Sequence, residues 1–559
     1  MGALNVHAEG NGRLGHRARF THQQVQQGPQ LHREQQFGLW GRSDVSGRHA
    51  VQVSRSWHRA GMTLQDALTG TAPISGWFFK SLPNHTTSVS MPLKVALGSG
   101  ALLLGLFLTA CMREQLFRPC PFGLPRGAVR ACGKIQVSKQ YAQPQGAALP
   151  LAFAVLPGRS KSAVATVVIP GGPGGRTGGW PRRLDRLFRE SGRRPLHDLI
   201  FYDQRGVGES REGPQTTCHI RLLTAELAPQ EFEGQVRDCL NAMKANGNDP
   251  ATLNTRSNAE DIVSLARALG YQQVNLYGLS YGTRTAQEVV KRHPEFVRSL
   301  VLDGVVDPAV NPFVTQPQHF QKTLSRFGQA CAAADRCPAG DYPTRIQQAA
   351  NELGALNLTF PGEVLDVQRP LPLKGSVLLS ALWDTGYSPR DMQAIDEMLR
   401  SGPAKDSATL DSLVESAANE GGNTVDPGVY AAVSCQDTRL PEQGIQSGLL
   451  PVFQHRAAAT VAIYRLCRDL GLGAPADAQA PIRAKVPTLL LSGRYDSVTP
   501  PETAQAVAAR FSPSTHVIFE QGGHTNGKSE CGLQLLLGFL DDPSRPPETQ
   551  CAARPYSFQ

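Results

Sequence analysis

Residues 274–282 of the chain read Val-Asn-Leu-Tyr-Gly-Leu-Ser-Tyr-Gly, with Ser280 at the centre of a Gly-x-Ser-x-Gly motif. The apolar residues before the motif predict a buried strand, and a helix-like segment follows it until Pro294. In a strand–turn–helix of this kind, the glycines permit a tight turn that exposes the serine hydroxyl. The motif alone is weak evidence, but this context makes Ser280 the predicted nucleophile. The alternative is a serine in an ordinary strand-to-helix turn.

Strand-like and helix-like segments alternate on both sides of this turn. A helix is expected over residues 257–269, opened by a capping box of Ser257 and Glu260. Such alternation predicts an α/β protein with a mostly parallel, doubly wound sheet. Together with the serine turn, the pattern indicates the α/β-hydrolase fold. The expected strands are residues 134–137, 149–155, 163–169, 199–202, 273–277, 300–306, 488–492 and 516–519.

The long segment between the sixth and seventh expected strands has a different pattern. Residues 311–480 are mainly helix-like, and 429–433 is the one run that resembles a strand. We expect this segment to form a helical cap over the carboxyl ends of the strands, where sheets of this type bind ligands. The hydrolase core would then consist of residues 131–310 and 481–559.

A serine hydroxyl needs a base to remove its proton, and the base needs a third group to orient it. In this fold the partners follow the serine in the order acid, then histidine. Asp496 and His524 each come just after an expected strand, and we predict them to be the acid and the base. His516 is the competing base, although it lies within a strand. Asp303, at the end of the sixth strand, is the competing acid.

The tetrahedral intermediate of acyl transfer also needs hydrogen-bond donors for its oxyanion. One predicted donor is the backbone N–H of Tyr281, directly after the nucleophile. The other is the backbone N–H of Gly172, in the glycine-rich loop at 170–175. A phosphate-binding loop is the alternative, but the Lys-Ser/Thr ending of such a loop is absent from this sequence. Neither a metal nor an organic cofactor is expected.

The chain has 11 cysteines, and none of them form a Cys-x-x-Cys pair typical of zinc or redox sites. If Cys111 carries a lipid, ten remain, an even number suited to an oxidising compartment. Spacing does not determine connectivity, but neighbouring cysteines suggest five disulfides. The suggested pairs are Cys120–Cys132, Cys218–Cys239, Cys331–Cys337, Cys435–Cys467 and Cys531–Cys551.

Residues 1–90 differ in composition from the rest of the chain. They hold nine Lys and Arg against four Asp and Glu, and seven of the 14 histidines. They therefore supply +5 of the net charge of +9, and without a basic run or a nucleic-acid motif in the remainder we expect no nucleic-acid partner. We interpret this segment as an extension that is not native or is disordered, with a metal-binding arm as an alternative.

A well-formed export signal begins at Met91. A lysine precedes the apolar run 95–108, which is shorter than the roughly 20 residues of a membrane span. The end of the run, Leu-Thr-Ala-Cys at 108–111, resembles the lipobox of bacterial lipoproteins. The resemblance implies a signal peptide at 91–110, acylation of Cys111 and a tether at 111–130. The expected location is the cell envelope, at the outer membrane or the periplasmic face. An uncleaved anchor or a plain secretory signal is the alternative.

Four motifs in order resemble the proline iminopeptidase and tripeptidyl aminopeptidase family, and the similarity covers about residues 120–551. They are GGPGG at 171–175, DQRGVGES at 203–210, GLSYGT at 278–283 and GGHT at 522–525. Two further segments, CGKIQV at 132–137 and SCQD at 434–437, resemble the tripeptidyl aminopeptidase-like branch. The resemblance implies a serine exopeptidase that acts on the N-termini of short peptides.

An aminopeptidase must recognise a free α-ammonium group, so we expect a carboxylate from the cap near the site. Asp437 is the first candidate, and Glu415, Glu420 and Asp426 are others. Two other functions remain open. A carboxylesterase would use the same chemistry on small esters, and a catalytically silent envelope lipoprotein would use the cap to bind a ligand. The expected partners are short peptides and, through the lipid anchor, a membrane.

Overall fold

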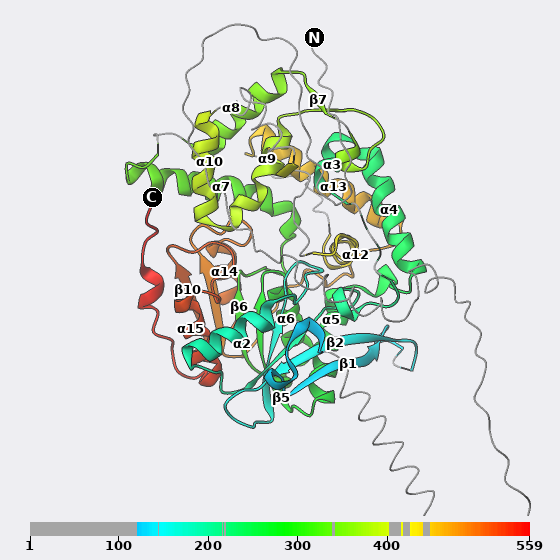
Figure 1. Ribbon diagram of the computed structural model, residues 1–559, viewed down its shortest axis with the longest axis vertical. Helices are drawn as coiled ribbons and strands as arrows, with labels where there is room; N and C mark the ends of the chain where they lie inside the picture. Colours follow the sequence, from blue (N-terminus) through cyan, green and yellow to red (C-terminus); the bar gives the residue numbers. More distant parts are fainter. Residues whose placement is uncertain are drawn as a thin grey trace, which may run out of the picture. The chain divides into compact units, whose positions relative to one another are not determined.

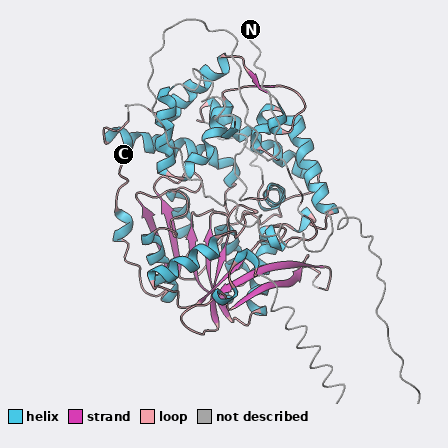
Figure 2. Cartoon of the chain, viewed as in Figure 1, coloured by secondary structure: helices cyan, strands magenta, loops and turns pink. Residues whose placement is uncertain are grey.

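The computed structural model describes residues 120–558, except 144, 215, 217, 219, 338–340, 361, 402–414, 417–424 and 440–447. The signal peptide, Cys111 and Glu420 lie outside the described residues. Figure 1 shows the arrangement of the elements, and Figure 2 distinguishes strands from helices.

The centre of the fold is an eight-stranded sheet with the order β1-β2-β4-β3-β5-β6-β9-β10. Strand β2 pairs antiparallel with β1 and β4, and every other neighbouring pair in this sheet is parallel. The predicted α/β-hydrolase fold with a mostly parallel sheet is therefore confirmed. The strands are β1 (Ala131–Ser138), β2 (Ala148–Leu156), β3 (Val164–Ile169), β4 (Asp198–Tyr202), β5 (Gln273–Leu279), β6 (Val297–Asp303), β9 (Thr488–Gly493) and β10 (Ser514–Phe519).

The central strands are apolar on both faces because helices cover both. Along β5, Val274 and Leu276 belong to the core on one face, whereas Tyr277 and Leu279 belong to the core on the other. This alternation follows the two-residue period of a strand. Helices α5 (Thr255–Ala268), α6 (Gly282–Arg292) and α14 (Pro501–Ala508) cover the first face, and α2 (Trp180–Ser191) and α15 (Glu530–Asp541) cover the second.

The expected capping box of α5 is wrong. The N-cap is Asn254, whose side chain accepts a hydrogen bond from the backbone N–H of Ser257. Glu260 instead contacts Arg292 at the end of α6 and His293, the C-cap of that helix. An asparagine is as good a cap as a serine, and in this case the helix begins at Thr255, two residues earlier than the sequence suggested.

The segment between β6 and β9 contributes a helical cap. The run 429–433, which resembled a strand, belongs to helix α12, because Asp426 caps the helix and Pro427 starts it. Two helices that precede β5, α3 (Leu222–Leu227) and α4 (Pro229–Ala245), bury their apolar side chains against the cap rather than against the sheet. The main cap helices are α7 (Pro312–Ala333), α8 (Tyr342–Ala355), α9 (Ser376–Leu382), α10 (Pro389–Ser401), α12 (Pro427–Asp437) and α13 (Pro451–Asp469).

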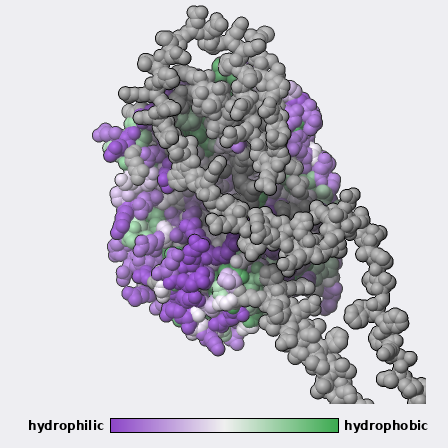
Figure 3. Space-filling view, viewed as in Figure 1, coloured by the Kyte–Doolittle hydropathy of each residue, from purple (hydrophilic) through white to green (hydrophobic). Residues whose placement is uncertain are grey.

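Five disulfides join the pairs that the cysteine spacing suggested. Disulfides persist in oxidising compartments, so they indicate an exported protein. The helices that the structure describes include none with the length and apolar character needed to cross a bilayer. On the face drawn in Figure 3, the coloured surface is mainly hydrophilic, with hydrophobic residues in small separate areas. The disulfides are Cys120–Cys132, Cys218–Cys239, Cys331–Cys337, Cys435–Cys467 and Cys531–Cys551.

Candidate active site

Ser280 lies in the tight turn between β5 and α6. Its φ of 52° is in the left-handed region, which a non-glycine residue rarely adopts. The turn requires the two flanking glycines, because a Cβ at Gly278 would lie 2.6 Å from the carbonyl oxygen of Gly282. A Cβ at Gly282 would lie 2.3 Å from the carbonyl oxygen of Ile169 on β3. The geometry is that of the nucleophile turn predicted from the motif.

The structure brings His524 and Asp496 together. Nδ1 of His524 lies 2.8 Å from Oδ2 of Asp496, and both side chains are buried. The other oxygen of Asp496, Oδ1, accepts hydrogen bonds from the backbone N–H groups of Val498 and Thr499, each at 2.8 Å. This carboxylate is therefore fixed in place by its own loop and oriented toward the imidazole.

Thr499 is a site residue that the sequence analysis missed. Its hydroxyl lies 2.7 Å from Oδ2 of Asp496 and 3.2 Å from Nδ1 of His524. A hydroxyl in this position can bond both members of the pair. In the sequence it is a threonine three residues after Asp496, and only the folded loop brings its hydroxyl to the carboxylate.

The competing acid, Asp303, has other partners. Its carboxylate accepts hydrogen bonds from the backbone N–H groups of Asn526 and Gly527 and from the hydroxyl of Tyr277. Complete burial raises the pKa of this carboxyl group. Its backbone oxygen accepts a hydrogen bond from the N–H of Ser280 at 2.8 Å. Asp303 thus connects the serine turn to the segment that follows His524.

The competing base, His516, lies on β10. Its Nε2 is 3.0 Å from the hydroxyl of Ser492 on the adjacent strand β9. Burial lowers the pKa of its imidazole. These contacts are within the sheet, and they favour a packing role.

A cap segment, η7 (Trp383–Tyr387), contacts the two loops that carry Asp496 and His524. The backbone N–H of His524 donates to the carbonyl of Tyr387 at 2.8 Å, and the Tyr387 ring packs edge-on against the imidazole at 5.1 Å. The hydroxyl of Ser497 donates to the carbonyl of Gly386 at 2.8 Å. The cap therefore forms part of the wall around the histidine.

The glycine-rich loop approaches the nucleophile closely. A Cβ at Gly171 would lie 2.9 Å from Cβ and 3.5 Å from Oγ of Ser280. Gly172 follows with a φ of +114°, which favours glycine. The side-chain amide of Gln204 donates to the carbonyls of Pro170 and Gly171 and so fixes the start of the loop.

Gln204 belongs to the motif at 203–210, whose other polar residues are structural. Asp203 accepts hydrogen bonds from the backbone N–H groups of Thr177 and Glu209. Arg205 forms a fully buried ion pair with Asp261 at 2.6 Å. Gln204 and Asp203 of this motif therefore bind the backbone on both sides of the glycine-rich loop.

The contacts of Asp437 argue against its predicted role in substrate binding. Asp437 is only 4% exposed, and its oxygens accept hydrogen bonds from the Thr255 N–H, the Thr255 hydroxyl and the Tyr281 hydroxyl. Arg284 lies 3.9 Å from the same carboxylate. These bonds are made inside the protein, and they favour a structural role for this carboxylate.

The other candidate carboxylates differ in their exposure and in their contacts. Glu415 is exposed. Asp426 is next to the glycine-rich loop, because its backbone N–H donates to the carbonyl of Gly174 at 2.9 Å. Its Oδ1 caps α12, burial raises its pKa, and the nearby charge of Arg176 acts in the opposite direction.

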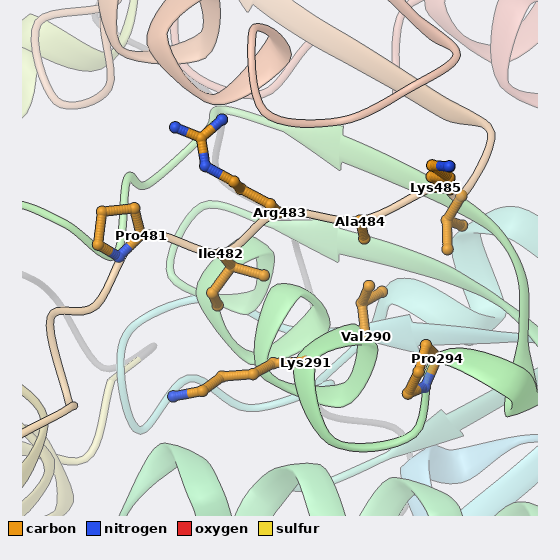
Figure 4. Close-up of a pocket in the computed structure, with 9 residues that line it drawn as sticks. Val290, Lys291, Pro294, Pro481, Ile482, Arg483, Ala484 and Lys485 are labelled. Carbon is orange, nitrogen blue, oxygen red and sulfur yellow. The ribbon is translucent and has the colours of Figure 1, made fainter.

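A cavity of about 200 Å³ lies beside the nucleophile. Ser280 and Thr525, the neighbour of His524, line it together with Gly171, Trp180 and Lys528. A hollow of about 480 Å³ elsewhere, shown in Figure 4, is formed by α6 and the segment before β9, with Lys291 and Ile482 in its lining and no triad candidate. Within the described part of the chain, no cluster of His, Cys, Asp or Glu is arranged to hold a metal ion.

Comparison with known proteins agrees with this geometry. A family model for the alpha/beta hydrolase fold matches residues 165–528. The serine protease Hip1 of Mycobacterium tuberculosis is 29% identical over 256 residues, which are 41% of this chain and 46% of that protein. The chain thus spans about half the length of Hip1. Tripeptidyl aminopeptidase of Streptomyces lividans is 25% identical, over 71% of this chain and 78% of that protein. Carboxylesterase B of Mycobacterium tuberculosis is 26% identical, over 56% of this chain and 62% of that protein.

Proposed function

The chain belongs to the alpha/beta hydrolase family, and from that premise we propose that it is a serine exopeptidase that acts on the N-termini of short peptides. The observation that carries the proposal is the buried Asp496–His524 pair, together with a strained serine turn that Asp303 connects to the segment after His524. Two relatives, a serine protease and a tripeptidyl aminopeptidase by name, support a peptide substrate.

In the proposed mechanism, Ser280 Oγ attacks the scissile carbonyl while His524 Nε2 takes its proton. Asp496 holds Nδ1–H and stabilises the imidazolium. The N–H groups of Tyr281 and Gly172 stabilise the oxyanion. The imidazolium then gives its proton to the leaving amine as the C–N bond breaks, and water hydrolyses the acyl-enzyme by the same steps.

We infer that Asp426 is the carboxylate that recognises the α-ammonium group of the peptide. It lies beside the glycine-rich loop, and its burial strengthens an ion pair with a bound amine. Asp426 therefore replaces Asp437 as the candidate for this role.

Mass spectrometry of the products from defined peptides tests the proposed function. We expect the wild type to release residues from the N-terminus and Ser280→Ala to release none. Cleavage at internal bonds or from the C-terminus would contradict the exopeptidase assignment, and equal activity of Ser280→Ala would contradict the serine mechanism.

An esterase is the second candidate, because one relative is named carboxylesterase B. The ratio of kcat/KM on aminoacyl arylamides to kcat/KM on small acyl esters separates the two functions. Activity confined to the acyl esters would support the esterase. A silent binding lipoprotein would hydrolyse neither class of substrate.

We further propose that the protein is tethered to the cell envelope by a lipid on Cys111. The lipobox-like sequence at 108–111 and the five disulfides support this location. Expression of Cys111→Ala in a bacterial host is the test. We expect the variant to move from the membrane fraction to the soluble fraction, and an unchanged membrane fraction would contradict the lipid anchor.

A further inference from the structure

Helix α12 of the cap contacts both segments that carry the proposed oxyanion donors. At its N-terminal end, the N–H of Asp426 donates to the carbonyl of Gly174 at 2.9 Å, and Val425 forms an antiparallel bridge with Gly175. These bonds attach the helix to the loop that contains Gly172. A Cβ at Gly174 would lie 3.1 Å from Cβ of Val429, so the Val429 side chain also packs closely against the loop.

At its C-terminal end, the same helix contacts the residue after the nucleophile. The hydroxyl of Tyr281 donates to Oδ2 of Asp437 at 2.8 Å. Tyr281 is 4% exposed, and burial raises its pKa well above the ordinary value, so the phenol remains a neutral donor. Arg284, one turn further along α6, donates to the backbone oxygen of Asp437 at 2.5 Å.

One disulfide is bonded to α12, and a second lies against it. Cys435, near its C-terminal end, is bonded to Cys467 on α13, and both sulfurs belong to buried residues. At the other end, a Cβ at Gly428 would lie 2.8 Å from Sγ of Cys239, which is bonded to Cys218. The helix therefore has little room to shift at either end.

We propose that α12 positions the oxyanion hole from the cap, and that the hydrogen bond from Tyr281 to Asp437 is the contact through which it aligns the donor after Ser280. The inference rests on the proposed serine hydrolase mechanism. An oxyanion donor acts by its placement relative to the tetrahedral oxygen, so a small displacement slows catalysis without weakening substrate binding. Asp437 and the Tyr281 hydroxyl are thus positioning groups, and Cys435–Cys467 fixes their partner helix.

Tyr281→Phe and Asp437→Asn are the test variants, because each alters this hydrogen bond and leaves the Tyr281 backbone N–H in place. We expect Tyr281→Phe to lower kcat about tenfold, with KM changed less than about twofold, as for an interaction specific to the transition state. The inhibition constant of a peptide boronate, which forms a tetrahedral adduct, should rise by the same factor. The double variant should lose little more than the worse single variant, since both act through one bond.

Tyr271→Phe is the matched control. Tyr271 is also a buried tyrosine whose hydroxyl donates to an aspartate, Asp198, at 2.7 Å, and it lies outside the candidate site. We expect this variant to lose stability but to keep the kcat and the boronate affinity of the wild type. Equal losses of kcat in Tyr281→Phe and Tyr271→Phe would overturn the proposal.

A second pair of variants tests the disulfide. Cys435→Ala/Cys467→Ala should lower kcat and the boronate affinity when assayed well below its unfolding temperature. Cys531→Ala/Cys551→Ala, which removes a disulfide outside the cap, should leave both unchanged. Wild-type kcat in Tyr281→Phe, or a change confined to KM, would contradict the positioning role while the mechanism stands. Failure of the wild type itself to hydrolyse peptides or esters would instead contradict the proposed function.

Discussion

Two buried aspartates lie close to His524, and their hydrogen bonds distinguish them. Asp496 bonds the imidazole directly, whereas Asp303 binds the backbone N–H groups of Asn526 and Gly527 in the loop that follows the histidine. Both side chains are completely buried. Burial alone therefore does not identify the catalytic acid. The hydrogen-bond partners of each carboxylate identify it.

Replacement of each aspartate by asparagine tests this distinction. We expect Asp496→Asn to lower kcat by about 10⁴-fold, because the amide no longer holds the required imidazole tautomer. Asp303→Asn should mainly lower the melting temperature, with kcat reduced by less than about tenfold, because its effect on the histidine is indirect. Steady-state kinetics and thermal unfolding of both variants check the assignment, and the reverse order of effects on kcat would contradict it.

The amine-binding role of Asp426 gives a prediction about KM. An asparagine at this position keeps an oxygen that can cap α12, but it removes the charge. We expect Asp426→Asn to raise KM for peptides with a free amino group about tenfold, as for a lost hydrogen bond to a charged group. KM for an acyl ester that lacks the amine should not change.

The pH dependence of the wild type provides an independent check on Asp426. Burial raises the pKa of this carboxyl group, and only the ionised form attracts an ammonium. KM for free-amine peptides should therefore rise as the pH falls through that raised pKa, and the rise should be absent in Asp426→Asn. A parallel rise in the variant would assign the titration to another group.

Local patterns predicted most of the candidate site at the level of residues. Ser280, Asp496 and His524 each follow a strand, where polar side chains at strand ends are expected to meet. Thr499 was missed because its role depends on a turn geometry that only the folded loop displays. Asp437 was assigned to the substrate because a motif does not reveal whether its carboxylate is satisfied by Thr255 and Tyr281.

At the scale of elements, the serine turn depends on the close approach of β3 and α6. Gly282 is in contact with the backbone of Ile169 and Pro170, where a Cβ would lie 2.3 and 2.7 Å from the two carbonyl oxygens. The first oxygen belongs to the end of β3, and the second belongs to the first residue of the glycine-rich loop. The start of α6 and the proposed oxyanion loop can therefore lie this close only because Gly282 has no side chain.

Gly282→Ala should separate these two elements. We expect it to cost roughly 3 kcal/mol of unfolding free energy and to abolish measurable peptidase activity, because the loop moves away from Ser280. Gly234→Ala is the control, since Gly234 lies within α4 with no atom within 4 Å of an added Cβ. That variant should gain about 0.5–1 kcal/mol through helix propensity and keep its activity. Similar stability of the two variants in denaturant would contradict this account.

The sequence predicted the existence of all eight strands of the main sheet, because their apolar runs are continuous or alternate with the strand period. It was less informative within the cap. The apolar run at 429–433 is compatible with a strand or a buried helix. The N-cap residue Asp426 and Pro427 in the first turn determine that it forms a helix. Helices α3 and α4 were not expected to join the cap, because that contact depends on tertiary packing between segments far apart in sequence.

At the scale of the whole molecule, the cap and the hydrolase core are coupled near Asp496. His319 on α7 lies with its Nδ1 3.4 Å from the carbonyl oxygen of Val498, in the loop that begins at Asp496. Burial is the main cause of its lowered pKa, with Lys322 acting in the same direction and Val498, Asp496 and Glu502 in the opposite one. The neutral imidazole is therefore the form that the folded protein accommodates.

This lowered pKa predicts how stability changes with pH. Below 6.5, the ordinary value for histidine, the unfolded chain binds a proton that the folded protein does not. The contribution of His319 is thus present above that pH and is lost as the pH falls through its lowered pKa. We expect the melting temperature of His319→Gln to fall less than that of the wild type over this range. A steeper fall in the variant would contradict the prediction.

A fluorophosphonate reacts covalently with the nucleophile of a serine hydrolase, and peptide mass spectrometry locates the modified residue. If Ser280, His524 and Asp496 form one catalytic unit, the wild type will carry the modification on Ser280 alone. His524→Ala will then react at least about a thousandfold more slowly, because the serine has lost its base. Modification at another residue, or an unchanged rate in His524→Ala, would contradict the account.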